Sequence, residues 1–390
     1  QQQNFVQGVY AVEEPDRPVD AIIFWANSVE LLTNADVRRL FNDSEEAGAF
    51  LTSKQIKAGK EVPRKEALRD PLFWKGMETE IDTLIDNGAT FGNPPPDSKV
   101  WVYSSRWVFT HKEDGTRKAR IVVRGYEERW VSDDDPATGS PTLQRESLRL
   151  IAHWAAHSRH KLEAWDVKSA FQQADTRHDP ESTEQSGIWI MPPKDFPEKY
   201  NLKGRCIKIP NNKTLYGMAS APRRFYFHLR ALMLKVGFEI SRFDECVFLW
   251  RVNGKLRGVA GYHVDDGLLS GDESFWQAME KVATLLKFGT RKKKDFKFCG
   301  VRIRQLADFS VELDQEDALN LIEPIPIKKG RPDSDGLTEA EVTQLRGRLG
   351  SLLYLTGNTR PFEAYAVSHI AGFVTEATVR ELKMINKYND

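Results

Sequence analysis

The chain has 390 residues, of which 40% are hydrophobic and 29% charged, and its formal net charge is zero. This composition is too apolar for a disordered chain and predicts two or three packed subdomains. No apolar run approaches the roughly 20 residues that cross a bilayer, so we expect no membrane segment. Because the charge is balanced, a nucleic-acid partner would require basic residues gathered on one surface.

Common motifs for metals and nucleotides are missing. The three cysteines are far apart and odd in number, which predicts free thiols in a reducing compartment and excludes a CxxC zinc module. His153, His157 and His160 have zinc-ligand spacing on one helix face, but without an acidic or cysteine partner we interpret them as packing or surface histidines. Walker A, GxGxxG, HExxH and GxSxG sequences do not occur.

The first sixty residues stay unassigned, apart from one apolar stretch at 21–25. Helical periodicity then predicts a helix over 64–87, with the apolar stripe Trp74, Met77, Ile81 and Leu84. A proline-rich loop follows.

Two strand-like runs, 100–111 and 118–124, predict a hairpin around the turn at 113–115. Side chains alternate across a strand, so Lys118 and Arg120 form part of a basic face opposite an apolar one. The pattern also suits a solvated edge ribbon.

The rest of the chain mixes helices and strands irregularly, which predicts an α+β fold rather than a doubly wound parallel sheet. An Asn253-Gly254 turn predicts a second hairpin, and Thr338 with Glu341 predicts a capping box. The expected elements are helices at 144–160 and 220–236, strands at 161–167, 246–252, 256–264 and around 296–303, a polar loop at 174–186, and a C-terminal helix with the stripe Val342, Leu345, Leu349 and Leu352.

Two acidic sites each close a strand-like run. Asp166 ends the first, and Asp265 with Asp266 ends the second. Most acidic pairs are solvated turn residues, but a hairpin with two carboxylates at its tip would lie beside Asp166 if the strands are neighbours. Such a group suits phosphoryl transfer with two magnesium ions, which prefer hard oxygen ligands.

Ordered blocks from about Glu66 to the C-terminus resemble the reverse transcriptases of copia-type long-terminal-repeat retrotransposons. The similar blocks are 66–80, 107–126, 140–149, the polymerase motif A at 166–171 (DVKSAF), motif B at 215–223, motif C at 263–266 (HVDD), and 349–368. The resemblance implies a right-hand polymerase with fingers, a thumb and an antiparallel-sheet palm that carries the catalytic carboxylates. It implies an RNA-directed DNA polymerase that adds deoxynucleotides to a primer 3′-hydroxyl.

The resemblance also assigns roles to residues. Phe171 would lie under the incoming sugar and exclude a 2′-hydroxyl, and the cofactor would be two Mg²⁺ ions, with Mn²⁺ as a substitute. The basic run at 291–294 suits either a phosphate contact or a solvated loop. The implied sites are catalytic, Asp166, Asp265 and Asp266; metal-binding, those three with Val167; nucleotide-binding, Lys112, Lys118, Arg120, Phe171, Tyr216 and Gly217; and nucleic-acid-binding, Arg223, His263, Arg291, Lys292, Lys293 and Lys294.

Some residues depart from the family pattern. His263 replaces a tyrosine that is usual in the family, and Ala219 and Ser220 replace lysine and glutamine. The pair 362–363 (Phe-Glu) replaces an acidic-apolar pair. The metal carboxylates are intact.

The expected domains are an unassigned extension (1–63), fingers (64–139 and 174–214), palm (140–173 and 215–304), and a thumb that begins the connection to a missing ribonuclease H domain (305–390). Expected partners are an RNA or DNA template with its primer, deoxynucleoside triphosphates and, in a dimer, a second copy. The resemblance implies a cytoplasmic retrotransposon particle or the nucleus. Two rivals stay open: a decayed copy that only binds nucleic acid, and a two-metal nuclease or cyclase, which Phe171 and the fingers hairpin disfavour.

Overall fold

The computed structural model describes residues 61–94, 102–111, 115–125, 139–180, 188–200, 202 and 204–389, and the backbone of three strands nearer the N-terminus. The chain divides into two compact units, Ala58–Leu313 and a second that joins Gln1–Lys57 to Asp314–Asp390. Among the described residues, no helix has both the length and the apolar character needed to cross a membrane. The early strands β1 (Tyr10–Ala11), β2 (Ala21–Trp25) and β3 (Ser28–Leu32) form an antiparallel sheet.

The helix predicted over 64–87 is two helices, α3 (Arg64–Ala67) and α4 (Pro71–Asp86). The prediction of one helix is wrong because Pro71 has no N–H to donate to the preceding turn, and it starts a new helix instead. Asp70 caps that helix, since its side chain accepts a hydrogen bond from the Leu72 N–H at 2.9 Å.

The buried stripe of α4 also differs by one residue from the prediction. Met77, Ile81 and Leu84 are buried as expected, but the fourth buried position is Phe73, and Trp74 is 36% exposed. The indole of Trp74 instead turns back toward the start of the helix, where its N–H donates a hydrogen bond to the Leu68 carbonyl.

The predicted basic hairpin is confirmed as β6 (Ser105–His111) and β7 (Arg117–Val123), which pair antiparallel. Ala119, Ile121 and Val123 are buried and pack with the stripe of α4 in one hydrophobic cluster. Beside them lies a four-stranded sheet in the order β4 (Thr90–Gly92), β10 (Cys206–Ile209), β9 (Ile188–Ile190) and β5 (Val102–Tyr103).

The central layer of the larger unit is a six-stranded antiparallel sheet. Its order is β11 (Glu239–Ile240), β12 (Val247–Val252), β13 (Lys255–His263), β14 (Asp266–Gly271), β8 (Lys161–Val167) and β15 (Phe288–Lys293). The pairing of β12 with β13 around Asn253-Gly254 confirms the second predicted hairpin.

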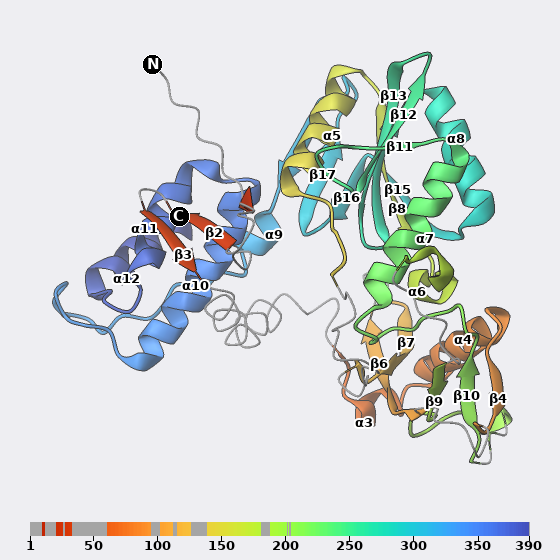
Figure 1. Cartoon of the computed structure of the whole chain (residues 1–390). Helices are drawn as coiled ribbons and strands as arrows, with labels where there is room; N and C mark the ends of the chain where they lie inside the picture. Colours follow the sequence, from red (N-terminus) through yellow and green to blue (C-terminus); the bar gives the residue numbers. More distant parts are fainter. Residues whose placement is uncertain are drawn as a thin grey trace. The chain divides into compact units, whose positions relative to one another are not determined.

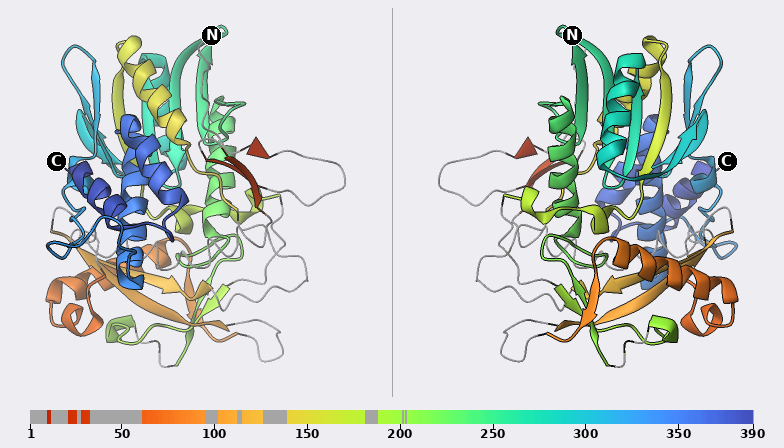
Figure 2. Two further views of the ribbon diagram at one scale, coloured as in Figure 1. Left: turned by 90° about the vertical axis from the view of Figure 1, so that its left-hand side faces the viewer. Right: turned by 90° about the vertical axis from the view of Figure 1, so that its right-hand side faces the viewer.

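Helices cover both faces of this sheet (Figure 1). α7 (Ala221–Val236) and α8 (Glu273–Leu285) pack on one face, where Trp165 and Leu269 point. α5 (Arg145–His157) packs on the other face, where Leu162 and Leu268 point. Figure 2 gives two side views of these layers. Short helices α6 (Ala170–Gln173), η2 (Thr176–His178) and η3 (Glu198–Tyr200) lie in the connections.

The single strand expected around 296–303 is wrong, because the chain turns back at Cys299–Gly300. These two residues have φ angles of 48° and 74°, so β16 (Asp295–Phe298) and β17 (Val301–Gln305) form a hairpin. With β18 (Val311–Asp314) they make a three-stranded sheet. The predicted α+β class is thereby confirmed.

The C-terminal part of the smaller unit is helical, with a core of its own. The predicted capping box of Thr338 and Glu341 is present, and of the predicted stripe only Val342 is incompletely buried. The elements are α9 (Glu316–Leu319), α10 (Glu339–Asn358), η4 (Pro361–Glu363), α11 (Ala364–Gly372), α12 (Val379–Asn386) and η5 (Lys387–Asn389).

Glu80 is a buried carboxylate where α4 meets β7, and only 8% of the residue is exposed. It accepts hydrogen bonds from the Ile121 backbone N–H at 3.4 Å and from Gln172 Nε2 at 3.1 Å. Burial raises the pKa of Glu80 to about 7, although the nearby charges of Lys118 and Arg120 oppose the rise.

We expect Glu80→Gln to make the chain more stable above pH 7. Above pH 7 the folded state of the natural chain contains a charged, buried Glu80, which costs stability. Below pH 4.5 the carboxyl is protonated in both the folded and the unfolded state, so the advantage of glutamine disappears. The gain grows as the pH rises between these values, to about 3 kcal/mol at most. Urea unfolding at pH 4.5 and pH 8 measures it, with Glu78→Gln on the same helix as control. An equal gain at both pH values would contradict the prediction.

Candidate active site

Strand pairing brings the two acidic sites together. β14 pairs with β8 so that Asp266 lies directly opposite Asp166. Val167 donates its backbone N–H to the Asp265 carbonyl at 2.9 Å. The expected hairpin beside Asp166 is therefore present, with Val264 and Asp265 as the two residues of its turn.

The turn that carries Asp265 has an unusual backbone. Val264 has a φ of 58°, which is rare for a β-branched side chain and marks local strain. Asp266 directly follows this turn. Burial and the carboxylates of Asp265 and Asp166 raise the pKa of Asp266 to about 6. The site thus concentrates negative charge, which would favour a bound cation.

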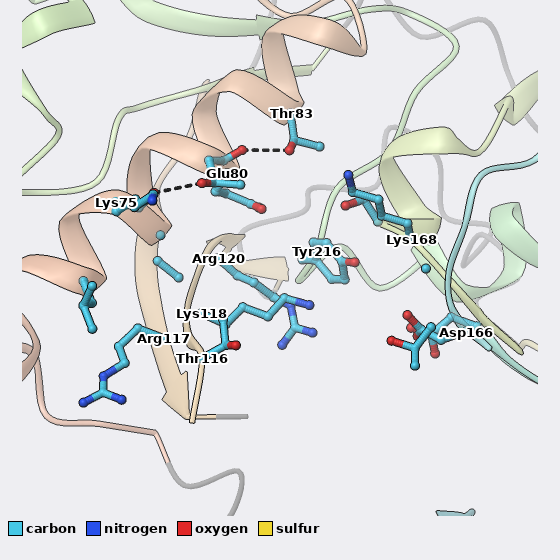
Figure 3. Close-up of a pocket in the computed structure, with 18 of the residues that line it drawn as sticks. Lys75, Glu80, Thr83, Thr116, Arg117, Lys118, Arg120, Asp166, Lys168 and Tyr216 are labelled. Atoms are coloured by element: carbon cyan, nitrogen blue, oxygen red, sulfur yellow. Dashed lines mark hydrogen bonds between the residues drawn. The ribbon is translucent and has the colours of Figure 1, made fainter. Parts of the chain in front are cut away.

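A pocket of about 560 Å³ lies between these carboxylates and the basic hairpin. Asp166 lies at one end, and Lys118 and Arg120 of β7 lie in the middle (Figure 3). Val167 and Asp265 also line the pocket, and a backbone hydrogen bond joins them beside Asp166. The basic face predicted from the alternation of β7 therefore points into the same space as the acidic residues. The remaining wall comes from α4 and from strand β15.

Aromatic side chains join the basic and acidic sides. The Arg120 guanidinium lies over the Tyr216 ring, 5.3 Å from its centroid, and that ring lies 4.9 Å from the ring of Phe171. Tyr216 lines the pocket, whereas Phe171 is not among its lining residues. Burial raises the pKa of Tyr216 well above its ordinary value, so its hydroxyl stays protonated.

Gly217 fixes motif B against the end of β7. Its φ is 92°, and a Cβ there would lie 2.0 Å from the Val123 carbonyl oxygen. In return, a Cβ on Gly125 would lie 2.1 Å from the Gly217 carbonyl oxygen. A backbone hydrogen bond from Val123 to Tyr216 at 2.8 Å completes this contact.

Several predicted nucleic-acid contacts are engaged within the chain. Arg223 is largely buried, 3.4 Å from Asp179 and stacked over Phe227. The basic run 291–294 is an exposed edge strand rather than a loop, as β15 extends through Lys293. Two of its members are held in ion pairs, Arg291 with Glu280 and Lys293 with Glu163.

Other predicted residues have simpler placements. His263 is half-buried opposite Asp266 on the neighbouring strand. Lys292 and Lys294 are exposed. Lys112 lies outside the described residues.

Most of the pocket lining received no role from the sequence, and two of these residues stand out. Gly289 lies so close to β8 that a Cβ there would stand 2.9 Å from Asp166 Oδ2, and no sequence signal marks it. Glu80 also lines the pocket. The sequence does mark Glu80, because it is a carboxylate at helical spacing within an apolar stripe.

Residues 93–324 match the family described as reverse transcriptase (RNA-dependent DNA polymerase). The Pol polyprotein of transposon RE1 from Arabidopsis thaliana is 29% identical to the chain, covering 83% of the chain and 22% of the polyprotein. The Pol polyprotein of transposon TNT 1-94 from Nicotiana tabacum is 27% identical, covering 80% of the chain and 24% of the polyprotein. The chain therefore spans about a fifth of the length of these relatives.

Among solved structures, the apo telomerase of Candida tropicalis matches with a TM-score of 0.39 and 9% identity, covering 80% of this chain and 68% of that one. A likeness at that score supports no inference. The match over residues 93–324 covers more than half of the chain, and the transposon relatives confirm the predicted copia type. The chain belongs to the reverse transcriptase (RNA-dependent DNA polymerase) family, as a copia-type domain with the right-hand polymerase fold of that family.

Proposed function

We propose that this chain synthesises DNA on a template by transfer of a nucleotidyl group from a deoxynucleoside triphosphate to a primer 3′-hydroxyl. The observation that carries the proposal is that Asp166 and Asp265 line the same pocket as Lys118 and Arg120. A triphosphate needs both kinds of residue, because the cations would bind its oxygens and the carboxylates would hold divalent metal ions. Family membership supports the same reaction.

The residues suit divalent metal ions, which reverse transcriptases generally use. Asp166, Val167 and Asp265 offer hard oxygen atoms at one end of the pocket, the ligand type that Mg²⁺ prefers. Within the described part of the chain, no three carboxylate, imidazole or thiol side chains form a metal cage by themselves. Asp166 and Asp265 would hold the metal ions, and two Mg²⁺ ions, when bound, would supply charge for activating the attacking oxygen and stabilising the leaving one.

The remaining residues bind and orient the substrate. Arg120 lines the pocket, so its guanidinium would donate hydrogen bonds to the phosphate oxygens. Tyr216 and Gly217 border the nucleotide, and Phe171 under Tyr216 limits the space for a 2′-hydroxyl. Lys112, Asp266 and His263 keep the roles that the resemblance implies. Catalysis on this scheme is mainly positioning and charge neutralisation.

We also propose the partners that follow from this reaction. These partners are an RNA or DNA template and its primer. The exposed Lys292 of β15 and Lys294 just after it would contact the phosphates of the template or primer. Arg223, Arg291 and Lys293 are held in ion pairs, so we assign them to positioning the strand and helix that carry them. The transposon relatives support a place in a cytoplasmic particle.

Primer extension tests the proposal directly. On a poly(rA)–oligo(dT) duplex with Mg²⁺ and dTTP, we expect the natural chain to extend the primer. Asp265→Asn should lower the rate by at least about 100-fold, because it removes a charge that holds the metal ions.

Asp86→Asn, on the exposed end of α4, is the matched control and should extend at the natural rate. If the natural chain shifts the duplex in a gel but never extends it, the proposal is wrong and the chain is a nucleic-acid-binding remnant. A shortened primer would indicate a nuclease.

Gly289→Ala tests the position of Asp166 without removing a charge. The added methyl would lie 2.9 Å from Asp166 Oδ2, so the carboxylate must move. We expect kcat to fall by about 10- to 100-fold, as a displacement near 1 Å does elsewhere, with little change in the melting temperature.

Gly139→Ala is the control for Gly289→Ala, because a Cβ at Gly139 meets no atom of the described residues within 4 Å. Equal rates for the two variants would show that Asp166 tolerates the methyl group and need not lie where the structure has it.

A further inference from the structure

Two chains of contacts connect the Arg120 guanidinium to the aromatic ring of Phe171. The first is a direct side-chain contact, in which Arg120 lies over Tyr216 and the Tyr216 ring lies against the tilted ring of Phe171. This contact joins the proposed phosphate ligand to the proposed sugar platform. It contains no hydrogen bond, so this route leaves the relative position of the two groups loosely defined.

The second route passes through Glu80. Its Oε1 accepts from the backbone N–H of Ile121, the residue after Arg120, and from the side-chain amide of Gln172, the residue after Phe171. Hydrogen bonds are directional, so this route fixes the relative position that the aromatic contact leaves loose. Together the two routes close a ring of contacts, of which Glu80, Arg120 and Tyr216 line the pocket.

A carboxylate in this position is costly to the fold. Gln172 is 1% exposed, and its Oε1 has no hydrogen-bond partner among the described residues. The raised pKa of Glu80 reflects the same unfavourable burial. An apolar side chain at position 80 would avoid the buried charge, but it would leave the Ile121 N–H and the Gln172 amide without this acceptor. The carboxylate therefore links β7 to α6 at the cost of a buried charge.

We propose that Glu80 is a positioning residue that sets the distance between the triphosphate-binding strand and the sugar platform, and thereby both nucleotide affinity and the preference for deoxyribose. This inference rests on the proposed polymerase function. Glu80 acts through Ile121 and Gln172, and it does not take part in the chemical step.

Substitutions of similar size separate hydrogen bonding from packing. Glu80→Leu fills the space but makes neither bond. Glu80→Gln keeps the acceptor for Ile121, and its amide can donate to the unpartnered Oε1 of Gln172. Glu78→Leu, on the exposed side of the same helix where Glu78 pairs with Lys199 at 3.0 Å, is the matched control. For each variant, KM for dTTP, the ratio of kcat/KM for dTTP to that for UTP, and the active fraction by burst amplitude are measured on poly(rA)–oligo(dT).

We expect Glu80→Leu to raise KM for dTTP and lower the dTTP-to-UTP ratio, each by about 2- to 12-fold per lost hydrogen bond. Glu80→Gln should restore both values, and Glu78→Leu should change neither. A merely structural role would lower only the active fraction. Natural KM and ratio in Glu80→Leu, or equal defects in Glu80→Gln and Glu80→Leu, would overturn the proposal.

Gln172→Met keeps the test decisive if Glu80→Leu does not fold. It removes the same link from the other side, and we expect the dTTP-to-UTP ratio to fall while KM changes less. An unchanged ratio would overturn the proposal. Failure of the underlying function is distinct, because the natural chain itself would then extend no primer.

Discussion

The site depends on the register between β8 and β14. With Asp266 opposite Asp166, both side chains project from one face of the sheet, and the turn places Asp265 at the pocket. A slip of one residue would move every side chain of β14 to the other face, so that Asp266 would no longer project from the same face as Asp166. The alternation of Leu268 and Leu269 between two hydrophobic clusters holds the register, so the packing of the core places the chemistry.

Local patterns in the sequence predicted much of this arrangement. The alternation of β7, the Asn253-Gly254 turn and the capping box at Thr338 are each decided by neighbouring residues, and the structure contains all three. Asp166 and Asp265 could be recognised because both end apolar strands. The errors arose where one residue changes the local geometry, as Pro71 divides the first helix and Cys299 starts a turn with a positive φ.

The other features of the site could not be predicted from the spacing of residues in the sequence, because they depend on contacts between distant segments. Gly289 matters only through its approach to Asp166 across the sheet. The ion pair of Arg223 with Asp179 joins residues 44 positions apart, and no spacing in the sequence indicates it. Glu80 is the intermediate case, since its place in an apolar stripe was visible but its partners Ile121 and Gln172 come from two other elements.

The contact between Gly125 and Gly217 limits how this gene can change. Each glycine faces the backbone around the other, so no larger residue is tolerated at either position without moving the strand or motif B. Nor can a second mutation compensate for the first, because each side chain would meet main-chain atoms that no substitution removes. In a transposon copy that selection no longer maintains, random mutation would reach these two codons as readily as any other. A copy that has lost either glycine is therefore expected to have lost this backbone contact.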